Sequence, residues 1–199
     1  MAKLHTNHTN SELYFVTENT GKFREAYEVL SKYGITLRQL SVKRIEIQSE
    51  NLEEIAKFSA QQLIKQYNLE LIVEDAGLFI EALNGFPGPF SSYVYKTIGV
   101  AGILKLMEGK TNRAAQFKSV VCYCSPKSKP AIFTGIVKGA ISKEPRGLRG
   151  FGFDPIFIPE GSDKTFAEMS VEEKNSFSHR AKAFKAFTEY YLKQILKSR

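Results

Sequence analysis

The chain has 199 residues, of which 43% are hydrophobic and 25% are charged, both close to the averages of globular proteins. This composition argues against a disordered chain, and no apolar run reaches the roughly 18 residues that a membrane helix needs. The formal net charge of +7 suggests an anionic partner such as a nucleotide, a phosphate or nucleic acid, although the positive residues are spread along the chain and a merely solvated basic surface stays open.

The length predicts one domain over residues 1–199 with a substantial core. Residues 1–12 are polar and contain no apolar signal-peptide core, so we expect a frayed leader and a cytoplasmic protein. The cysteines, Cys122 and Cys124, lie two residues apart on one face of a predicted strand, where a disulfide is geometrically poor. We expect both to be reduced packing residues.

The first predicted strand, Leu13–Val16, leads through a polar loop, residues 17–22, into a helix whose apolar residues recur at helical spacing from Phe23 to Leu30. Such a connection aims backbone N–H groups and the positive end of the helix at one point, which suits phosphate, and Lys22 adds a full charge. The GxxxxGK[ST] spacing of a P-loop is missing, and many ordinary connections contain the same residue types.

Two further strands are expected before the second helix, over residues 35–37 and residues 45–48. The second of these is a short alternating piece that carries Glu46, which is either a functional acid or an ordinary solvent-facing residue. A long helix follows, with an inner face that runs from Leu52 to Tyr67.

Two adjacent carboxylates follow the next apolar run, Leu71–Val73. We interpret the run as a strand that ends there and delivers Glu74 and Asp75 to its carboxyl end, where open α/β sheets bind ligands. The next segment, residues 84–92, is rich in glycine and proline, and it is either a plain connection or a wall of the site.

The second half of the chain begins with a predicted helix over residues 100–107. Two β runs, residues 115–124 and 131–141, are joined by a polar segment bounded by prolines and predict a long antiparallel hairpin. The loop that follows places Phe151 and Phe153 around a glycine, where they would either stack on a base or belong to the core.

The last predicted helix begins after Ser178, a good N-cap, so His179 and Arg180 occupy its first turn. Cations there are unfavourable against the helix dipole by roughly a few tenths of a kcal/mol, a conflict that an anionic ligand would remove. Two ordinary polar residues at a helix end are the alternative.

The potentially reactive groups share one property, because each lies at the end of a predicted element. The carboxylates suit Mg²⁺, which takes oxygen ligands from one or two carboxylates, phosphates and water. The cations suit a polyphosphate, and the aromatic side chains beside a basic helix start suit a purine. The residues alone therefore predict a metal-dependent nucleotide hydrolase.

Six short motifs occur in order along the chain. They are Thr17–Lys22, Glu46–Gln48, Glu74–Leu78, Phe86–Tyr93, Phe151–Phe157 and Ser178–Arg180. Together they resemble the inosine triphosphate pyrophosphatase family over nearly the whole chain. The resemblance implies an α/β fold with an elongated, twisted mixed β-sheet, flanking helices, and two lobes with a central cleft. It also implies a homodimer that uses Mg²⁺ to hydrolyse ITP, dITP and XTP to the monophosphate and pyrophosphate, which cleanses the nucleotide pool.

The resemblance further implies a role for each matching residue. Asp75 would be the catalytic proton acceptor for the attacking water and, together with Glu46, would hold Mg²⁺. The residues that would bind substrate are Thr17, Glu18, Asn19, Thr20, Gly21 and Lys22 at the triphosphate, Phe151, Gly152, Phe153, Asp154, His179 and Arg180 at the base, and Ala76 and Lys174 elsewhere.

Three positions depart from the family's pattern. Ala76 stands where the family usually has serine, so a hydroxyl contact to substrate is lost or replaced by backbone. Phe153 stands where tyrosine is common, which removes another hydroxyl. A lysine that reaches the phosphates in many relatives falls near Lys57 or Phe58, so Lys57 is a candidate contact whose register is not fixed.

Two other functions compete with this one. A related pyrophosphatase that acts on modified pyrimidine or methylated nucleotides would need a different pocket around Phe151 and Arg180. A nucleic-acid-binding protein would use the positive charge, but clustered acids such as Glu74 and Asp75 repel phosphates unless a metal intervenes. We therefore expect a purine nucleotide as the partner, and neither nucleic acid nor a membrane.

Overall fold

The computed structural model describes residues 12–126 and 128–197. Within them, seven strands form one mixed sheet in the order β2-β1-β3-β5-β6-β7, with β4 beside β3. The strands are β1 (Leu13–Val16), β2 (Leu37–Leu40), β3 (Leu71–Ile80), β4 (Pro87–Gly88), β5 (Ala114–Ser125), β6 (Ser128–Ile141) and β7 (Phe157–Pro159). The expected leader, residues 1–12, lies outside the described residues except for its last position.

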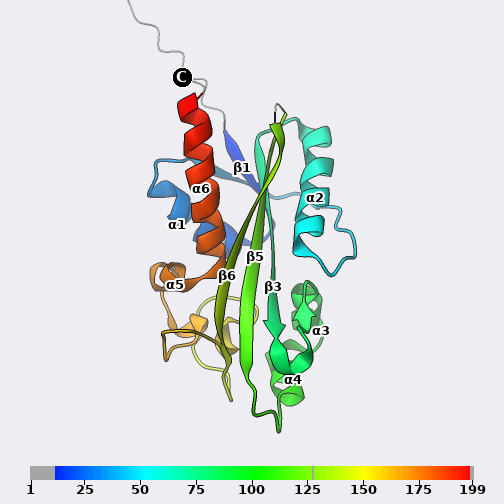
Figure 1. Cartoon of the computed structure of the whole chain (residues 1–199), viewed down its shortest axis with the longest axis vertical. Helices are drawn as coiled ribbons and strands as arrows, with labels where there is room; N and C mark the ends of the chain where they lie inside the picture. The colour runs from blue at the N-terminus through cyan, green and yellow to red at the C-terminus, as the bar shows by residue number, and fades with distance from the viewer. Residues whose placement is uncertain (1–11, 127, 198–199) are drawn as a thin grey trace, which may run out of the picture.

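Helices flank both faces of this sheet (Figure 1). They are α1 (Thr20–Ser31), α2 (Leu52–Tyr67), α3 (Ser91–Thr97), α4 (Gly99–Leu106), α5 (Val171–Phe177) and α6 (His179–Lys197), with short 3₁₀ turns at Glu81–Leu83, Asp154–Ile156 and Phe166–Glu168. None of the helices in the described part of the chain is long and apolar enough to span a membrane.

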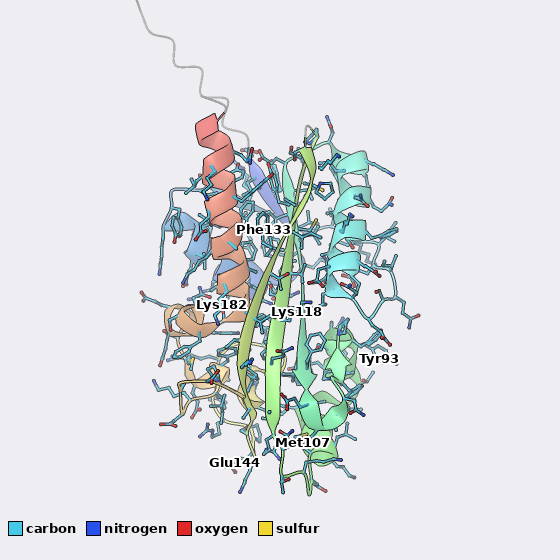
Figure 2. All side chains as sticks on the ribbon, viewed as in Figure 1. Tyr93, Met107, Lys118, Phe133, Glu144 and Lys182 are labelled. Carbon is cyan, nitrogen blue, oxygen red and sulfur yellow. The ribbon has the colours of Figure 1, made fainter. Side chains whose placement is uncertain are left out.

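The predicted antiparallel hairpin is confirmed, and its two strands lie in the centre of the sheet. Strands β5 and β6 pair antiparallel along almost their whole length, and β3 pairs antiparallel with β5 from Leu71 to Ile80. In Figure 1 these three strands run the length of an elongated molecule, with Phe133 in the upper part of the hairpin and Lys118 near its middle in Figure 2. The elongated mixed α/β fold expected from the sequence is therefore confirmed.

The upper parts of the central strands β1, β3 and β5 are buried on both faces because these strands are apolar on both faces. Successive side chains of a strand point to opposite faces. Ile72 of β3 accordingly packs in a cluster with α1 and α6, which includes Phe184, while Leu71 and Val73 pack with α2 on the other face. Cys122 and Cys124 lie in the α2 cluster as free, buried thiols, as predicted.

A second apolar cluster fills the lower half of the molecule on the same side as α6. Leu78 and Ile80 of β3 and Phe117 of β5 belong to it. Leu78 and Ile80 are an even number of residues from Ile72, so all three side chains lie on the same face of β3. On this face, polar residues of β3 and β5 separate the upper apolar cluster from the lower one. Glu74 of β3 and Ser119 of β5 occupy this polar stretch, and it divides the molecule into two lobes.

Three details of the predicted elements are wrong, and one helix was not predicted. Residues 45–48 do not form a strand, and β2 begins at Leu37 rather than at residue 35. Strand β3 does not end at its acids but continues to Ile80, because β5 pairs with it throughout. Helix α3 was not predicted, since its seven residues carry no long apolar repeat.

The location of the acids is nevertheless close to the expected one. Strand β1 pairs in parallel with β3 only at Tyr14 and Phe15, opposite Leu71 and Ile72. Beyond that point β3 has no β1 neighbour, so the acids follow the carboxyl end of the parallel part of the sheet. Glu74 and Asp75 point to opposite faces, as neighbours on a strand must.

Candidate active site

A cleft of about 750 Å³ opens between the lobes beside this free edge of β3. Thirteen of the predicted site residues line it: Thr17, Glu18, Asn19, Lys22, Glu46, Asp75, Ala76, Phe151, Gly152, Phe153, Asp154, His179 and Arg180. Thr20, Gly21 and Lys174 do not, and neither does Lys57. A separate, more open hollow of about 420 Å³ between α1 and α5 contains none of the predicted site residues.

The turn between β1 and α1 has the arrangement expected of an anion site. Asn19 caps the helix, and its Oδ1 accepts a hydrogen bond of 2.9 Å from the Lys22 backbone N–H. Thr17 Oγ1 in turn accepts from the Asn19 N–H at 3.1 Å. The first turn of α1 contains no acid, so its positive end is not neutralised from within the helix. Lys22 reaches back to β3, where its Nζ lies 2.8 Å from Glu74 Oε2.

Glu74 is fully occupied by protein partners. Its Oε1 accepts hydrogen bonds from Ser119 Oγ at 2.7 Å and from Arg180 Nε at 3.1 Å. Burial opposes ionisation of Glu74, but the positive charges of Arg180 and Lys22 outweigh it and hold the pKa of this carboxyl well below its usual range. Glu74 is therefore a charged link between α1, β3 and α6.

The chain of charges continues from Arg180 into the second lobe. Arg180 Nη1 donates to Glu25 Oε2 at 2.5 Å, and Lys174 Nζ lies 2.7 Å from Glu25 Oε1 and 2.6 Å from Asp154 Oδ2. Burial raises the pKa of Asp154 despite the nearby Lys174. Lys174 is 3% exposed and is held by two carboxylates behind the cleft wall.

Glu25 is the member of this network that sequence reasoning missed. It lies on the inner face of α1 next to Ala26, and it is 3% exposed. A charged residue is almost never fully buried unless it is paired. Its position beside the apolar stripe was therefore the available signal, but the partners come from α5 and α6, about 150 residues away in the sequence.

On the other face of β3, Asp75 faces the extended segment between β2 and α2. Arg44 donates to Asp75 through Nη2 at 3.1 Å and through Nη1 at 3.4 Å, and the same Nη2 donates to Glu46 Oε1 at 2.5 Å. Burial raises the pKa of Asp75, and the negative charges of Glu46 and Glu74 raise it further, against the opposite effect of Arg44 and Lys22. Arg44 was also missed, although it lies two residues from Glu46 and so on the same side of an extended segment.

The residues of this acid pair fit a hard divalent cation. The two carboxylates already share one cation, because the Arg44 guanidinium pairs with both of them. A metal ion between them would take over this pairing. Within residues 12–126 and 128–197, no three or more His, Cys, Asp or Glu side chains gather into a metal cage. Two carboxylates suit Mg²⁺, which usually completes its shell with substrate phosphates and water.

The opposite end of the cleft is aromatic. His179 stacks on Phe117 with ring centroids 4.7 Å apart and an interplanar angle of 11°. Burial, reinforced by the charges of Arg180 and Lys174, holds the pKa of His179 well below its ordinary value, so the imidazole is neutral at pH 7. Its Nδ1 is buried without a hydrogen-bond partner among the described residues. A buried polar atom of this kind needs a ligand or water to satisfy it.

The two candidate stacking residues differ in role. Phe153 is 3% exposed and packs edge-on against Tyr95 at 5.5 Å, so most of its ring belongs to the lower core. Phe151 lies over the first turn of α1, where a Cβ added at Gly21 would meet its ring at 2.6 Å. Gly21 therefore allows the Phe151 ring to pack against the first turn of α1.

This geometry matches a family of known proteins. The model of the Ham1 family matches residues 13–190. The chain belongs to the Ham1 family. It is 53% identical to a dITP/XTP pyrophosphatase of Methanopyrus kandleri over 184 residues, 92% of this chain and 98% of that protein. It is 52% identical to a dITP/XTP pyrophosphatase of Thermococcus kodakarensis over 185 residues, 93% of this chain and 99% of that protein.

A solved structure agrees with this assignment. The HAM1 protein from Coxiella burnetii superposes with a TM-score of 0.81 at 31% identity, covering 92% of this chain and 98% of that one. The family resemblance and the α/β fold inferred from the sequence are therefore confirmed for this Ham1 chain. The roles of the individual cleft residues stay predictions.

Proposed function

We propose that this chain is a Mg²⁺-dependent pyrophosphatase that hydrolyses dITP, ITP and XTP to the nucleoside monophosphate and pyrophosphate. Membership of the Ham1 family and relatives named dITP/XTP pyrophosphatase support the reaction class and the purine substrate. The observation that carries the proposal is that one cleft combines a phosphate-facing helix start, a carboxylate pair and an aromatic pocket. Its volume of about 750 Å³ is within the range of nucleotide-sized sites.

In this proposal the triphosphate lies against the start of α1. Asn19 orders the turn, and Lys22 and the backbone N–H groups at the helix start bind phosphate oxygens. Glu46 and Asp75 would hold Mg²⁺, which would supply positive charge that neutralises the leaving pyrophosphate. Asp75 accepts the proton of the attacking water, a role for which it is placed by its position in the cleft.

Base selectivity would come from the aromatic end of the cleft. Hypoxanthine and xanthine carry a 6-oxo acceptor where adenine carries an amino donor. The neutral His179 lines the cleft and can donate a ring N–H to that oxygen, whereas adenine would leave the donor unpaired, which is costly. Phe151 provides the ring on which the base stacks, and Arg180, fixed by Glu74 and Glu25, holds the pocket in place.

We further propose one catalytic domain that works in the cytoplasm as a homodimer and binds neither nucleic acid nor membrane. The homodimer rests on the family resemblance. Several large apolar side chains are available for such a contact on the surface of α3, among them Tyr93, which is 68% exposed and labelled at the edge of the molecule in Figure 2. The acids of the cleft argue against a nucleic-acid groove, because they would repel a phosphate backbone.

Product analysis tests the function directly. Purified protein is incubated with ITP, XTP, ATP and GTP, with and without Mg²⁺, beside the variants Asp75→Asn and Asp163→Asn. The second variant makes the same chemical change at an exposed residue outside the cleft. We expect IMP and pyrophosphate from ITP, full activity in Asp163→Asn and almost none in Asp75→Asn. Formation of IDP and phosphate would move the attack to the γ-phosphorus and exclude this mechanism, and equal turnover of ATP would exclude the proposed base pocket.

A further inference from the structure

We propose that Arg44 is a built-in cation that holds the metal-binding carboxylates closed, so that a divalent ion must displace it and binds well only together with the nucleotide. This inference deepens the proposed function, because it concerns the same pair of acids. It assigns to Arg44 a positioning role that the family motifs do not include.

The contacts of Arg44 carry the first step. Its side chain is 13% exposed, and the partners that the described residues give its guanidinium are Asp75 and Glu46. Both are the carboxylates that would hold the metal. A guanidinium carries half the charge of a divalent ion, but its planar set of donors pairs with both carboxylates at once and so occupies the oxygens that a metal would use. The acids are therefore already paired before any metal arrives.

The backbone keeps Arg44 at this place. Arg44 and Glu46 are alternate residues of an extended segment, and Ile45 between them is 66% exposed. The segment is anchored at this point, since the Ile45 carbonyl oxygen accepts a hydrogen bond of 2.7 Å from Ser59 Oγ on α2. Because the segment is held there, Arg44 cannot drift far from the acids, although its side chain can rotate away from them.

Competition follows from electrostatics. A divalent ion that approaches Glu46 and Asp75 meets the positive charge of Arg44 within a few ångströms, and the two cations cannot use the same oxygens. The ion is favoured once a nucleotide is present, because the triphosphate gives the metal additional oxygen ligands and gives the displaced guanidinium an anionic partner. The structure therefore predicts weak metal binding to the free protein and ordered binding of the metal with the nucleotide.

Mn²⁺ binding to the nucleotide-free protein tests this inference, with calorimetry or the loss of the free Mn²⁺ electron paramagnetic resonance signal as the readout. The variants are Arg44→Met, which keeps the length of the side chain, and Arg44→Lys, which keeps its charge. Lys43→Met is the matched control, because Lys43 also lines the cleft but has no ion pair among the described contacts. Thermal unfolding of each variant establishes that it is folded.

We expect Arg44→Met to bind Mn²⁺ about tenfold or more tightly than the unaltered protein, the order expected from removing a nearby like charge. Arg44→Lys should lie between the two, and Lys43→Met should change the affinity by less than about threefold, because a more distant exposed charge is screened. Adding Glu46→Gln to Arg44→Met should remove the gain. Equal Mn²⁺ affinity in Arg44→Met and the unaltered protein would overturn the inference, as would an equal gain in Lys43→Met.

The outcome is separate from that of the product analysis. No nucleotide is present, so the affinity change is expected whichever triphosphate the protein hydrolyses. If ITP is not hydrolysed but Arg44→Met binds Mn²⁺ more tightly, the proposed function fails and the role of Arg44 stands. If ITP is hydrolysed and the affinity is unchanged, the role of Arg44 fails alone.

Discussion

Lys22 Nζ lies 2.8 Å from Glu74 Oε2, and this ion pair joins the first turn of α1 to the middle of β3. The Glu74 side chain is inaccessible to solvent, whereas that of Lys22 is 19% exposed and lines the cleft. The pair therefore connects a buried charge to the place where phosphate is expected. Glu74 keeps the ammonium group of Lys22 in position, and its remaining oxygen keeps Arg180 in position on the other side.

Replacing Lys22 should weaken substrate binding more than the chemical step. We expect Lys22→Met to raise the KM for ITP by about tenfold or more, because it removes a charged hydrogen bond to the triphosphate that is typically worth about 1.5 to 3 kcal/mol. Steady-state kinetics measure the effect, with Lys32→Met at the exposed end of α1 as the control. An unchanged KM in Lys22→Met would mean that the turn does not bind the triphosphate.

Lys174 should affect stability far more than an exposed lysine does. Lys174→Met leaves Glu25 and Asp154 buried with one positive partner fewer, and removing one member of a buried ion pair typically costs about 3 to 5 kcal/mol. Lys164→Met breaks the exposed pair with Glu173 and should change the stability far less, because solvent screens that pair. Chemical denaturation of both variants checks this difference. Equal stabilities would contradict the buried network and leave substrate contact as the role of Lys174.

The neutral state of His179 should make stability depend on pH in a defined direction. In the unfolded chain this histidine takes up a proton below about pH 6.5, whereas the folded state resists the proton. The unfolded state then binds more protons, so the free energy of unfolding falls by up to about 1.4 kcal/mol per pH unit as the pH decreases from 6.5.

Substitution isolates this contribution. His179→Gln should remove that part of the pH dependence between pH 5 and 6.5, as measured by thermal or chemical unfolding at several pH values. The other histidines, His5 and His8, are unchanged in this comparison. The same pH slope in both proteins would show that folding does not lower the pKa of His179, which would remove the argument that the fold keeps this imidazole neutral.

Gly135 of β6 should be required for the placement of α6. A Cβ at this position would lie 2.1 Å from the His179 carbonyl oxygen and 2.5 Å from the Ala183 backbone nitrogen. Gly135→Ala must push the start of α6 off the sheet, which typically costs about 1 to 3 kcal/mol. Because His179 and Arg180 begin that helix, selectivity for ITP over ATP should also fall. Thr134→Ala, one residue away, should leave selectivity unchanged, and a loss in both would point to β6 itself.

The fold could be predicted mainly where a local pattern decides it. The hairpin, the first strand and helix, and the N-cap at Ser178 depend on neighbouring residues, and all of them are confirmed. The extent of β3 could not be predicted in the same way. Two adjacent acids normally interrupt a strand, but here β5 pairs with β3 past Asp75, and that pairing is set by a segment about 45 residues further along the chain.

The residues of the cleft divide in the same way, into those that a local motif identifies and those that depend on distant partners. Motifs that lie at element ends identified most of the lining, including Asn19, Asp75 and His179. Arg44 and Glu25 were missed because their importance depends on partners brought together by the fold. Lys174 was expected at the substrate, but its partners bury it behind the wall of the cleft. A sequence motif thus identifies residues of the site, but it does not indicate whether each side chain lines the cleft or is buried behind its lining.

The continuity of the long strands has a mechanical consequence. Strand β5 contributes Val121 to the upper apolar cluster and Phe117 to the lower one, with no flexible linker between them. The two lobes therefore cannot move as separate rigid bodies about a hinge, because any relative motion must twist or bend the hydrogen-bonded strands that they share. Any change in the width of the cleft is then expected in the segments along its rim, such as the stretch that carries Arg44. The lobes should also lose their structure together, as a single cooperative unit.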